Sequence, residues 1–194
     1  MAQCECQQMA TTLTDRKILM IALILNISMF VIGLIAGVFA QSTGLIADAL
    51  DMLADASAYA LGLFAVGRNL RFKSMTARLS GSILLILGIS VLIDVARRFG
   101  FGSSPISTVM IMIASISLVV NGSVLILLRR FRGGEVHLRA TWIFTRADVI
   151  ANLGVIASGI LVAITNSRYP DLIMGLAISL YVIREAFAIL KSTY

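Results

Sequence analysis

Three aspartates lie close together in an otherwise apolar stretch, the segment IADALDMLADAS at residues 46–57. A helix turns about 100° per residue, so the spacing of Asp48, Asp51 and Asp55 places the three carboxylates on one helical face. Carboxylate oxygens bind divalent cations. The pattern therefore indicates a site for a cation or a proton on this face. Asp48 by itself also fits a capping position at the start of a helix.

A second polar group lies in the segment FTRADVIAN at residues 144–152. Asp148 and Asn152 are one helical turn apart and share a face, whereas Arg146 points roughly 160° away from Asp148 on a regular helix. The favoured role for Arg146 is an ion pair with an acidic residue of another helix. The alternatives are a contact that holds a dimer, or replacement of a metal's charge.

The composition indicates that these polar residues lie in a membrane. Of the 194 residues, 59% are hydrophobic and 13% are charged. A soluble domain of this length needs more charge to stay dissolved. The net charge of +6 lies mostly in short loops, which fits membrane orientation rather than nucleic-acid binding. No catalytic nucleophile or nucleotide-binding loop is evident, so we expect neither enzymatic activity nor a prosthetic group.

Six segments are apolar enough to cross a bilayer, which takes about 20 helical residues. They are residues 17–40, 43–66, 77–96, 105–128, 140–165 and 170–190. Most basic residues fall on the side of the termini, and only Arg97, Arg98 and Arg168 fall on the other side, so both termini are predicted to be cytoplasmic. We therefore expect an all-α integral membrane protein. It would consist of a cytoplasmic tail over residues 1–15, a transmembrane domain over residues 16–194, and no soluble C-terminal domain.

The six spans divide into two halves of three, and an odd number per half inverts one half relative to the other. The second and fifth spans hold matching places in the two halves, and they carry the aspartates. An aspartate at the centre of a span costs about 2.5–3.5 kcal/mol on insertion scales, so the carboxylates should face the bundle interior. Two acidic helices that face each other repel unless a cation lies between them. The sequence thus predicts a cation site between these two spans, near mid-membrane.

The residues around these aspartates resemble the cation diffusion facilitator family, which comprises proton-coupled exporters of divalent metals. The segment GLIAGVFAQSTGLIADALDMLADASAYALGLFA is similar to the family's first two helices. Asp51 and Asp55 match its second-helix motif, which is Asp or His, three residues, then Asp. The segment VHLRATWIFTRADVIANLGVIASGILV resembles its fifth helix, and the resemblance extends over nearly the whole chain.

The resemblance implies a metal site made by Asp51, Asp55 and Asp148, with Asp48 and Asn152 as candidates to complete it. The chain departs from the family at the fourth ligand position, where the motif spacing places Phe144. Phenylalanine offers no lone pair. In the family a histidine there is associated with zinc, so the transported metal stays open among zinc, cadmium, cobalt, manganese and iron(II).

The length of the chain is a second departure from the family. Most members carry a further cytoplasmic domain of ferredoxin-like shape, which binds metal and aids dimerisation. This chain stops soon after its sixth span. A homodimer is therefore expected to form through the transmembrane helices.

Three residues near the termini or in a basic loop could gather metal at a cytoplasmic entrance. Cys4 and Cys6 place two thiols at close spacing in the tail, and thiolates favour softer ions such as zinc or cadmium. His137 is the sole histidine of the chain, and it lies in the basic segment RRFRGGEVHLR. A surface histidine is the default interpretation, and metal capture is the alternative.

The resemblance implies a carrier in the plasma membrane that exports divalent metal in exchange for protons, with the bundle exposing its site to each side in turn. An accessory or regulatory membrane protein derived from a carrier is an alternative. It is favoured by Phe144, by Arg146 and by the short chain. A third hypothesis is transport of a bulky organic cation, for which Phe144 and Trp142 would supply aromatic faces.

Overall fold

The computed structural model describes the backbone of residues 2–64, 70–129 and 136–191, and the side chains of residues 16–61, 63, 75, 78–129 and 145–191. The described part is all-helical. Its helices are α1 (Ala2–Phe39), α2 (Thr43–Phe64), α3 (Leu70–Phe101), α4 (Ser107–Leu128), α5 (Val136–Thr165) and α6 (Tyr169–Lys191). Within the described residues, five of these helices are long and apolar enough to cross a membrane, and α2, which carries the three aspartates, is the exception.

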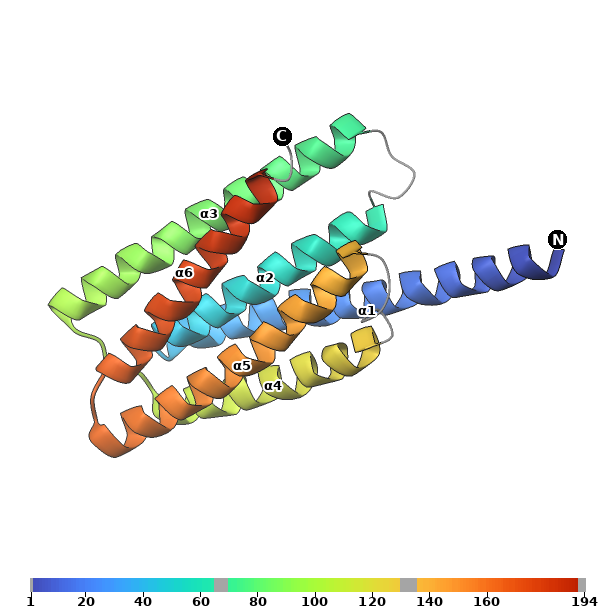
Figure 1. Cartoon of the computed structure of the whole chain (residues 1–194). Helices are drawn as coiled ribbons and strands as arrows, with labels where there is room; N and C mark the ends of the chain where they lie inside the picture. Colours follow the sequence, from blue (N-terminus) through green and yellow to red (C-terminus); the bar gives the residue numbers. More distant parts are fainter. Residues whose placement is uncertain (1, 65–69, 130–135, 192–194) are drawn as a thin grey trace.

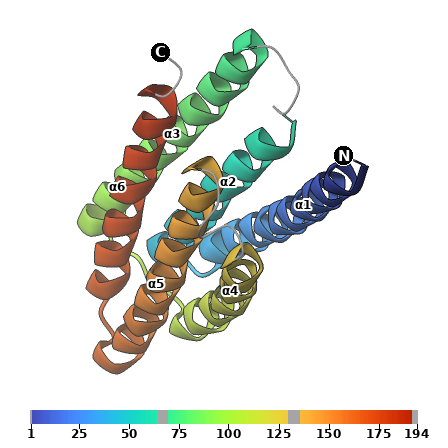
Figure 2. The same ribbon diagram turned by 45° about the vertical axis from the view of Figure 1, so that its right-hand side comes forward.

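The helices run up and down in alternation, so that both termini lie at one end of the bundle (Figure 1). We call the opposite end, where residues 40–42, 102–106 and 166–168 connect successive helices, the distal end. Neighbouring pairs are α1 with α2, α3 with α6, and α4 with α5, as the turned view also shows (Figure 2). Helix α2 contacts each of the other five helices. The most acidic helix is thus the one most shielded from lipid.

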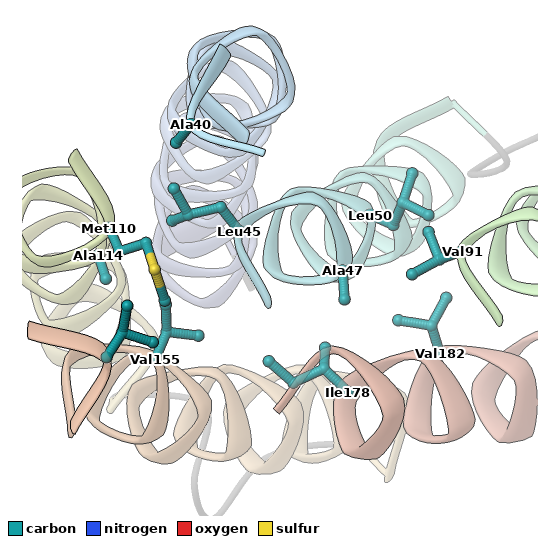
Figure 3. Close-up of a cluster of buried hydrophobic side chains, with 11 residues drawn as sticks. Ala40, Leu45, Ala47, Leu50, Val91, Met110, Ala114, Val155, Ile178 and Val182 are labelled. Atoms are coloured by element: carbon teal, nitrogen blue, oxygen red, sulfur yellow. The ribbon is translucent and has the colours of Figure 1, made fainter. Parts of the chain in front are cut away.

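An apolar cluster at the middle of the bundle joins the two halves of the chain. Leu45 and Leu50 of α2 meet Val155 of α5 and Val182 of α6 in this cluster (Figure 3). By contrast, isoleucines such as Ile35 of α1 and Ile86 of α3 are exposed at the outer surface, with 66% and 67% of their surface accessible. Exposed aliphatic faces of this kind suit contact with lipid tails.

Small residues allow the helices to approach closely where α2 begins. A Cβ atom added at Gly37 of α1 would lie 2.9 Å from the backbone nitrogen of Ile46, and one added at Gly175 of α6 would lie 2.7 Å from the Cβ of Thr43. Glycine lets backbones pack at such distances in membrane bundles. Helices α1 and α6 therefore pack directly against the first turn of α2.

A carboxylate of α6 caps the start of α2. Asp171, which is fully buried, accepts hydrogen bonds from the backbone nitrogens of Thr43 (2.8 Å) and Gly44 (3.0 Å), and from the hydroxyl of Ser42 (2.5 Å). Ser42 itself accepts a hydrogen bond from the backbone nitrogen of Leu45 (3.1 Å). These bonds satisfy amides that a helix start otherwise leaves unpaired.

The predicted spans agree with the helices in position, with three differences at the ends. The expectation that residues 43–66 are apolar enough to cross a bilayer is wrong for the described part of α2, because of its three aspartates. Residues 2–15, expected as a tail, continue α1 as helix, and α3 begins and ends outside its predicted limits. Asp94 forms ion pairs with Arg97 and Arg98, which are three and four residues further along α3. Pairs at this spacing stabilise a helix and so favour helix beyond the apolar part of α3. His137, expected in a loop, belongs to the first turn of α5. The side of the membrane on which the termini lie stays a prediction.

The Asp171 cap predicts a stability loss on truncation. Asp171→Ala leaves the buried amides of Thr43 and Gly44 without acceptors, so the free energy of unfolding should fall by about 1–3 kcal/mol. Denaturant titration in mixed micelles measures this change. Ser90→Ala is the control, because the exposed Ser90 hydroxyl bonds only within α3. Equal stability of the two variants would contradict the capping role.

Candidate metal site

The three aspartates of α2 all lie inside the bundle. Their exposed fractions are 3% for Asp48, 5% for Asp51 and 7% for Asp55, and Asp148 of α5 is 3% exposed. The helical spacing that placed them on one face therefore turns that face inward, away from lipid. Asp48 does not cap α2, since Ser42 and Asp171 occupy that role, so the capping alternative is wrong.

Asp51, Asp55 and Asp148 form one acidic cluster between α2 and α5. The carboxyl group of Asp148 is within hydrogen-bonding reach of both Asp51 and Asp55. Oδ2 of Asp51 and Oδ2 of Asp148 are buried without a hydrogen-bond partner. The cluster thus holds two free acceptor oxygens in a site closed to bulk water.

Asp55 is the aspartate of the cluster that other side chains hold most firmly. Its Oδ2 accepts hydrogen bonds from the hydroxyl of Tyr59 (2.8 Å), one turn along α2, and from the hydroxyl of Thr145 on α5 (3.3 Å). These two hydroxyl oxygens are also 2.7 Å apart. Sequence analysis missed Tyr59 and Thr145, although the spacing of Tyr59 four residues after Asp55 was a signal for it.

Asp48 belongs to an adjoining polar network rather than to the cluster itself. The side-chain amide of Asn152 donates to Oδ1 of Asp48 (2.6 Å), and the side-chain amide of Asn121 on α4 donates to Oδ1 of Asn152 (3.0 Å). Oδ1 of Asn121 is buried without a partner. Asp48 lies one turn nearer the distal end than Asp51. The network therefore extends the polar interior from the cluster toward that end.

Glu185 of α6 adds to the negative charge of this region. Its side chain is half-buried, and its charge repels those of Asp51 and Asp55. Arg184, the next residue, offsets part of this charge from an exposed position. Repulsion between carboxylates is strong where water is excluded. The interior between α2, α5 and α6 therefore favours positive charge, either protons or a metal ion.

The described side chains do not form the coordination sphere of a metal ion. Among them, no three His, Cys, Asp or Glu residues are arranged as ligands of a single ion. The carboxyl groups of Asp51 and Asp55 instead lie close to that of Asp148. Carboxylates this close in an apolar interior repel one another unless a proton or a cation lies between them.

Comparison with known proteins identifies the family of this chain. The family model of the cation efflux transmembrane domain matches residues 19–194, which is most of the chain. This chain belongs to the cation efflux family. The resemblance found in the sequence is thereby confirmed. Together with the helices suited to crossing a bilayer, membership makes this cation efflux domain a multi-pass plasma membrane protein.

Three relatives show how the chain compares with other proteins of the cation efflux family. The metal cation efflux system protein CzcD of Cupriavidus metallidurans is 25% identical, over 92% of this chain and 60% of its own length. The zinc transporter ZitB of Pectobacterium atrosepticum is 28% identical, over 92% and 60%. The cadmium, cobalt and zinc/H(+)-K(+) antiporter of Bacillus subtilis is 23% identical, over 92% and 62%. The chain spans about three fifths of the length of these relatives.

Arg146 lies outside the acidic cluster of this cation efflux domain. Its side chain is exposed, and the structure gives it no ion pair with any described residue. The expectation of a structural ion pair therefore finds no partner in the described part, and replacement of a metal's charge by Arg146 is wrong. The side chains of Phe144, Trp142, His137, Cys4 and Cys6 lie outside the described side chains.

The Asn121–Asn152–Asp48 network predicts unequal costs for its two asparagines. Asn152→Leu leaves groups of both Asp48 and Asn121 unpaired, so the free energy of unfolding should fall by about 1–3 kcal/mol for each. Asn121→Leu removes one bond and should cost less. The double variant should cost little more than Asn152→Leu, because the two residues share one network. Denaturant titration in micelles, with the exposed Ser123→Ala as control, measures these differences; additive costs would contradict the network.

Proposed function

We propose that the protein exports divalent metal ions across the plasma membrane in exchange for protons, and that Asp51, Asp55 and Asp148 bind the ion. The observation that carries this proposal is the buried acidic cluster, in which two carboxylate oxygens have no partner. Such a cluster is expensive in a membrane unless something cationic occupies it. The family in which it occurs moves cations, and the protein is a carrier rather than an enzyme.

The names of the relatives favour zinc, cadmium or cobalt as the cargo. They describe a zinc transporter and an antiporter of cadmium, cobalt and zinc with protons and potassium. The cluster of this chain offers oxygen ligands, which also suit manganese and iron(II). Phe144 stands where the family places a fourth ligand, so Asp48, Asn152 or water would complete the site. Cys4, Cys6 and His137 would gather ions on the side of the termini, which we propose is cytoplasmic.

The closeness of the three carboxyl groups suggests how exchange would work. Carboxylates this close in an apolar interior repel one another unless protons or a cation bind them, so a divalent ion would displace protons to reach the oxygens. Binding of the ion from one side would release protons there. Return of protons from the other side would release the ion. The six-helix bundle would expose the site to each side in turn, as carriers built from inverted halves do.

Two other functions remain alternatives, each with a distinguishing result. An accessory membrane protein would bind metal without moving it, and Phe144 favours that role. The exposure of Arg146 removes one argument for it. A carrier of organic cations would ignore metal ions. A homodimer through the transmembrane helices stays a prediction under each of these functions.

Metal-driven proton flux in proteoliposomes tests the proposal. Zinc, cadmium, cobalt, manganese and iron(II) would each be added to vesicles that contain a trapped pH-sensitive dye. We expect flux for one or two of these metals, and its loss in Asp51→Asn and in Asp148→Asn. Asp94→Asn is the matched control, because Asp94 lies outside the cluster and pairs with Arg97 and Arg98. Folded protein with no proton flux for any of these metals would refute the proposed export of divalent metal ions.

Tyr59 predicts a graded effect on metal affinity. Tyr59→Phe removes the hydrogen bond that orients Asp55 but leaves all three carboxylates in place. Groups that orient metal ligands are typically worth 10–100-fold in affinity, so binding should weaken by at least about tenfold. Titration calorimetry with the metal found by the flux assay measures this. Tyr169→Phe, at the exposed distal end, should bind as the wild type does. Unchanged affinity in Tyr59→Phe would show that Asp55 does not bind metal through this arrangement.

A further inference from the structure

A polar cavity lies at the distal end, away from the acidic cluster. It has a volume of about 320 Å³ and lies between the α3–α4 and α5–α6 connections, which occupy the same end of the bundle in Figure 1. Such a volume holds about ten water molecules. Its polar lining comprises Ser103, Ser104, Ser107, Asn166, Ser167 and Arg168. The remaining lining residues are a proline and two aliphatic residues, so no acidic side chain lines it.

Arg168 is the charged residue of this cavity, and its neighbours fix its position. One guanidinium nitrogen donates to the backbone oxygen of Phe99 (3.2 Å), and the guanidinium lies over the ring of Tyr169 at 5.7 Å. Gly102, with a φ of 96°, makes room for it, since a Cβ there would lie 3.0 Å from Nη1. The Nε of Arg168 and the hydroxyl of Ser103 are buried without hydrogen-bond partners. The cavity thus carries an uncompensated positive charge and unused hydrogen-bond donors.

Helix α4 begins at the cavity and adds to its positive potential. Helix α4 starts at Ser107 and has no side-chain cap, because the residue before it is Ile106. Helix α6 starts directly after Arg168 but offers few free amides, because the backbone nitrogen of Tyr169 bonds to the hydroxyl of Ser167, Pro170 has no N–H, and Asp171 lies in the first turn. Free amides at helix starts carry partial positive charge and bind anions, phosphate groups in particular. The guanidinium, the hydroxyls and the start of α4 therefore favour the same kind of ligand.

We propose that this cavity binds a phosphate-type oxyanion. An arginine with several hydroxyls and helix amides matches the charge and the acceptor oxygens of a phosphate group. A divalent metal is disfavoured, because no described acidic group lines the cavity and the arginine repels it. The phosphate can belong to a lipid headgroup at the bilayer surface or to a free ion. A bound phosphate would bridge the start of α4 and Arg168 and so hold the two connections together.

Binding to two probes tests the proposal on the full chain without any metal. Delipidated protein in neutral detergent would be titrated with phosphatidylglycerol, followed by native mass spectrometry, and with inorganic phosphate, followed by calorimetry. We expect wild-type protein to bind at least one probe. Arg168→Gln should weaken binding by at least about tenfold, since it removes a charge-assisted hydrogen bond. Arg97→Gln is the matched control, because Arg97 is exposed at the same end and pairs with Asp94 outside the cavity.

A second variant separates loss of binding from loss of folding. Ser107→Glu places a carboxylate in the first turn of α4, where negative charge stabilises a helix, and this carboxylate would repel the anion. We expect normal thermal stability with binding weakened to the level of Arg168→Gln. Loss of lipid binding alone would identify a headgroup site, and loss of phosphate binding would identify a free anion. Failure of wild-type protein to bind either probe, or wild-type affinity in both variants, would overturn the proposal.

Discussion

Burial of carboxylates in an apolar bundle is the constraint on which this structure depends. Asp48, Asp51 and Asp55 could not face lipid without a large cost, and the fold avoids that cost by surrounding α2 with all five other helices. The other five helices are apolar enough to face lipid themselves. The arrangement of the bundle thus follows from which helix has to be hidden.

The buried carboxylates in and around α2 are of two kinds, which differ in whether all their oxygens have hydrogen-bond donors. Both oxygens of Asp171 accept hydrogen bonds, and their donors lie within the first turn of α2 or directly before it. Asp51 and Asp148 each keep a buried oxygen without a partner. A satisfied carboxylate stabilises a fold, whereas an unsatisfied one costs free energy unless a further ligand binds. Aspartate therefore stabilises the fold at the distal end, whereas in the interior it keeps an oxygen available for a ligand.

Sequence alone predicted the spans and the inward face of α2, because hydropathy and helical periodicity are local properties. It did not predict the partners of the aspartates. Other helices supply the partners of α2 and of its polar network, namely Thr145, Asn121 and Asp171. Local spacing in the sequence does not say which helices become neighbours. Asn152 was a candidate to complete the metal site from its spacing alone, and its hydrogen bonds to Asp48 and to Asn121 of α4 could not be predicted that way. Rotation and contact of whole helices decide such details.

The polar interior is asymmetric along the bundle axis. Toward the termini, Tyr59 and Thr145 close over Asp55 with hydrogen bonds that leave its Oδ2 fully engaged. Toward the distal end, the free oxygens of Asp51 and Asp148 are followed by Asp48 and by the unpartnered oxygen of Asn121. A cation that leaves the cluster toward the distal end would therefore meet further oxygen ligands after one helical turn. At the distal end itself Arg98 donates hydrogen bonds to Asp94 and to the backbone oxygen of Gln41, so part of its charge is offset by a carboxylate that it shares with Arg97.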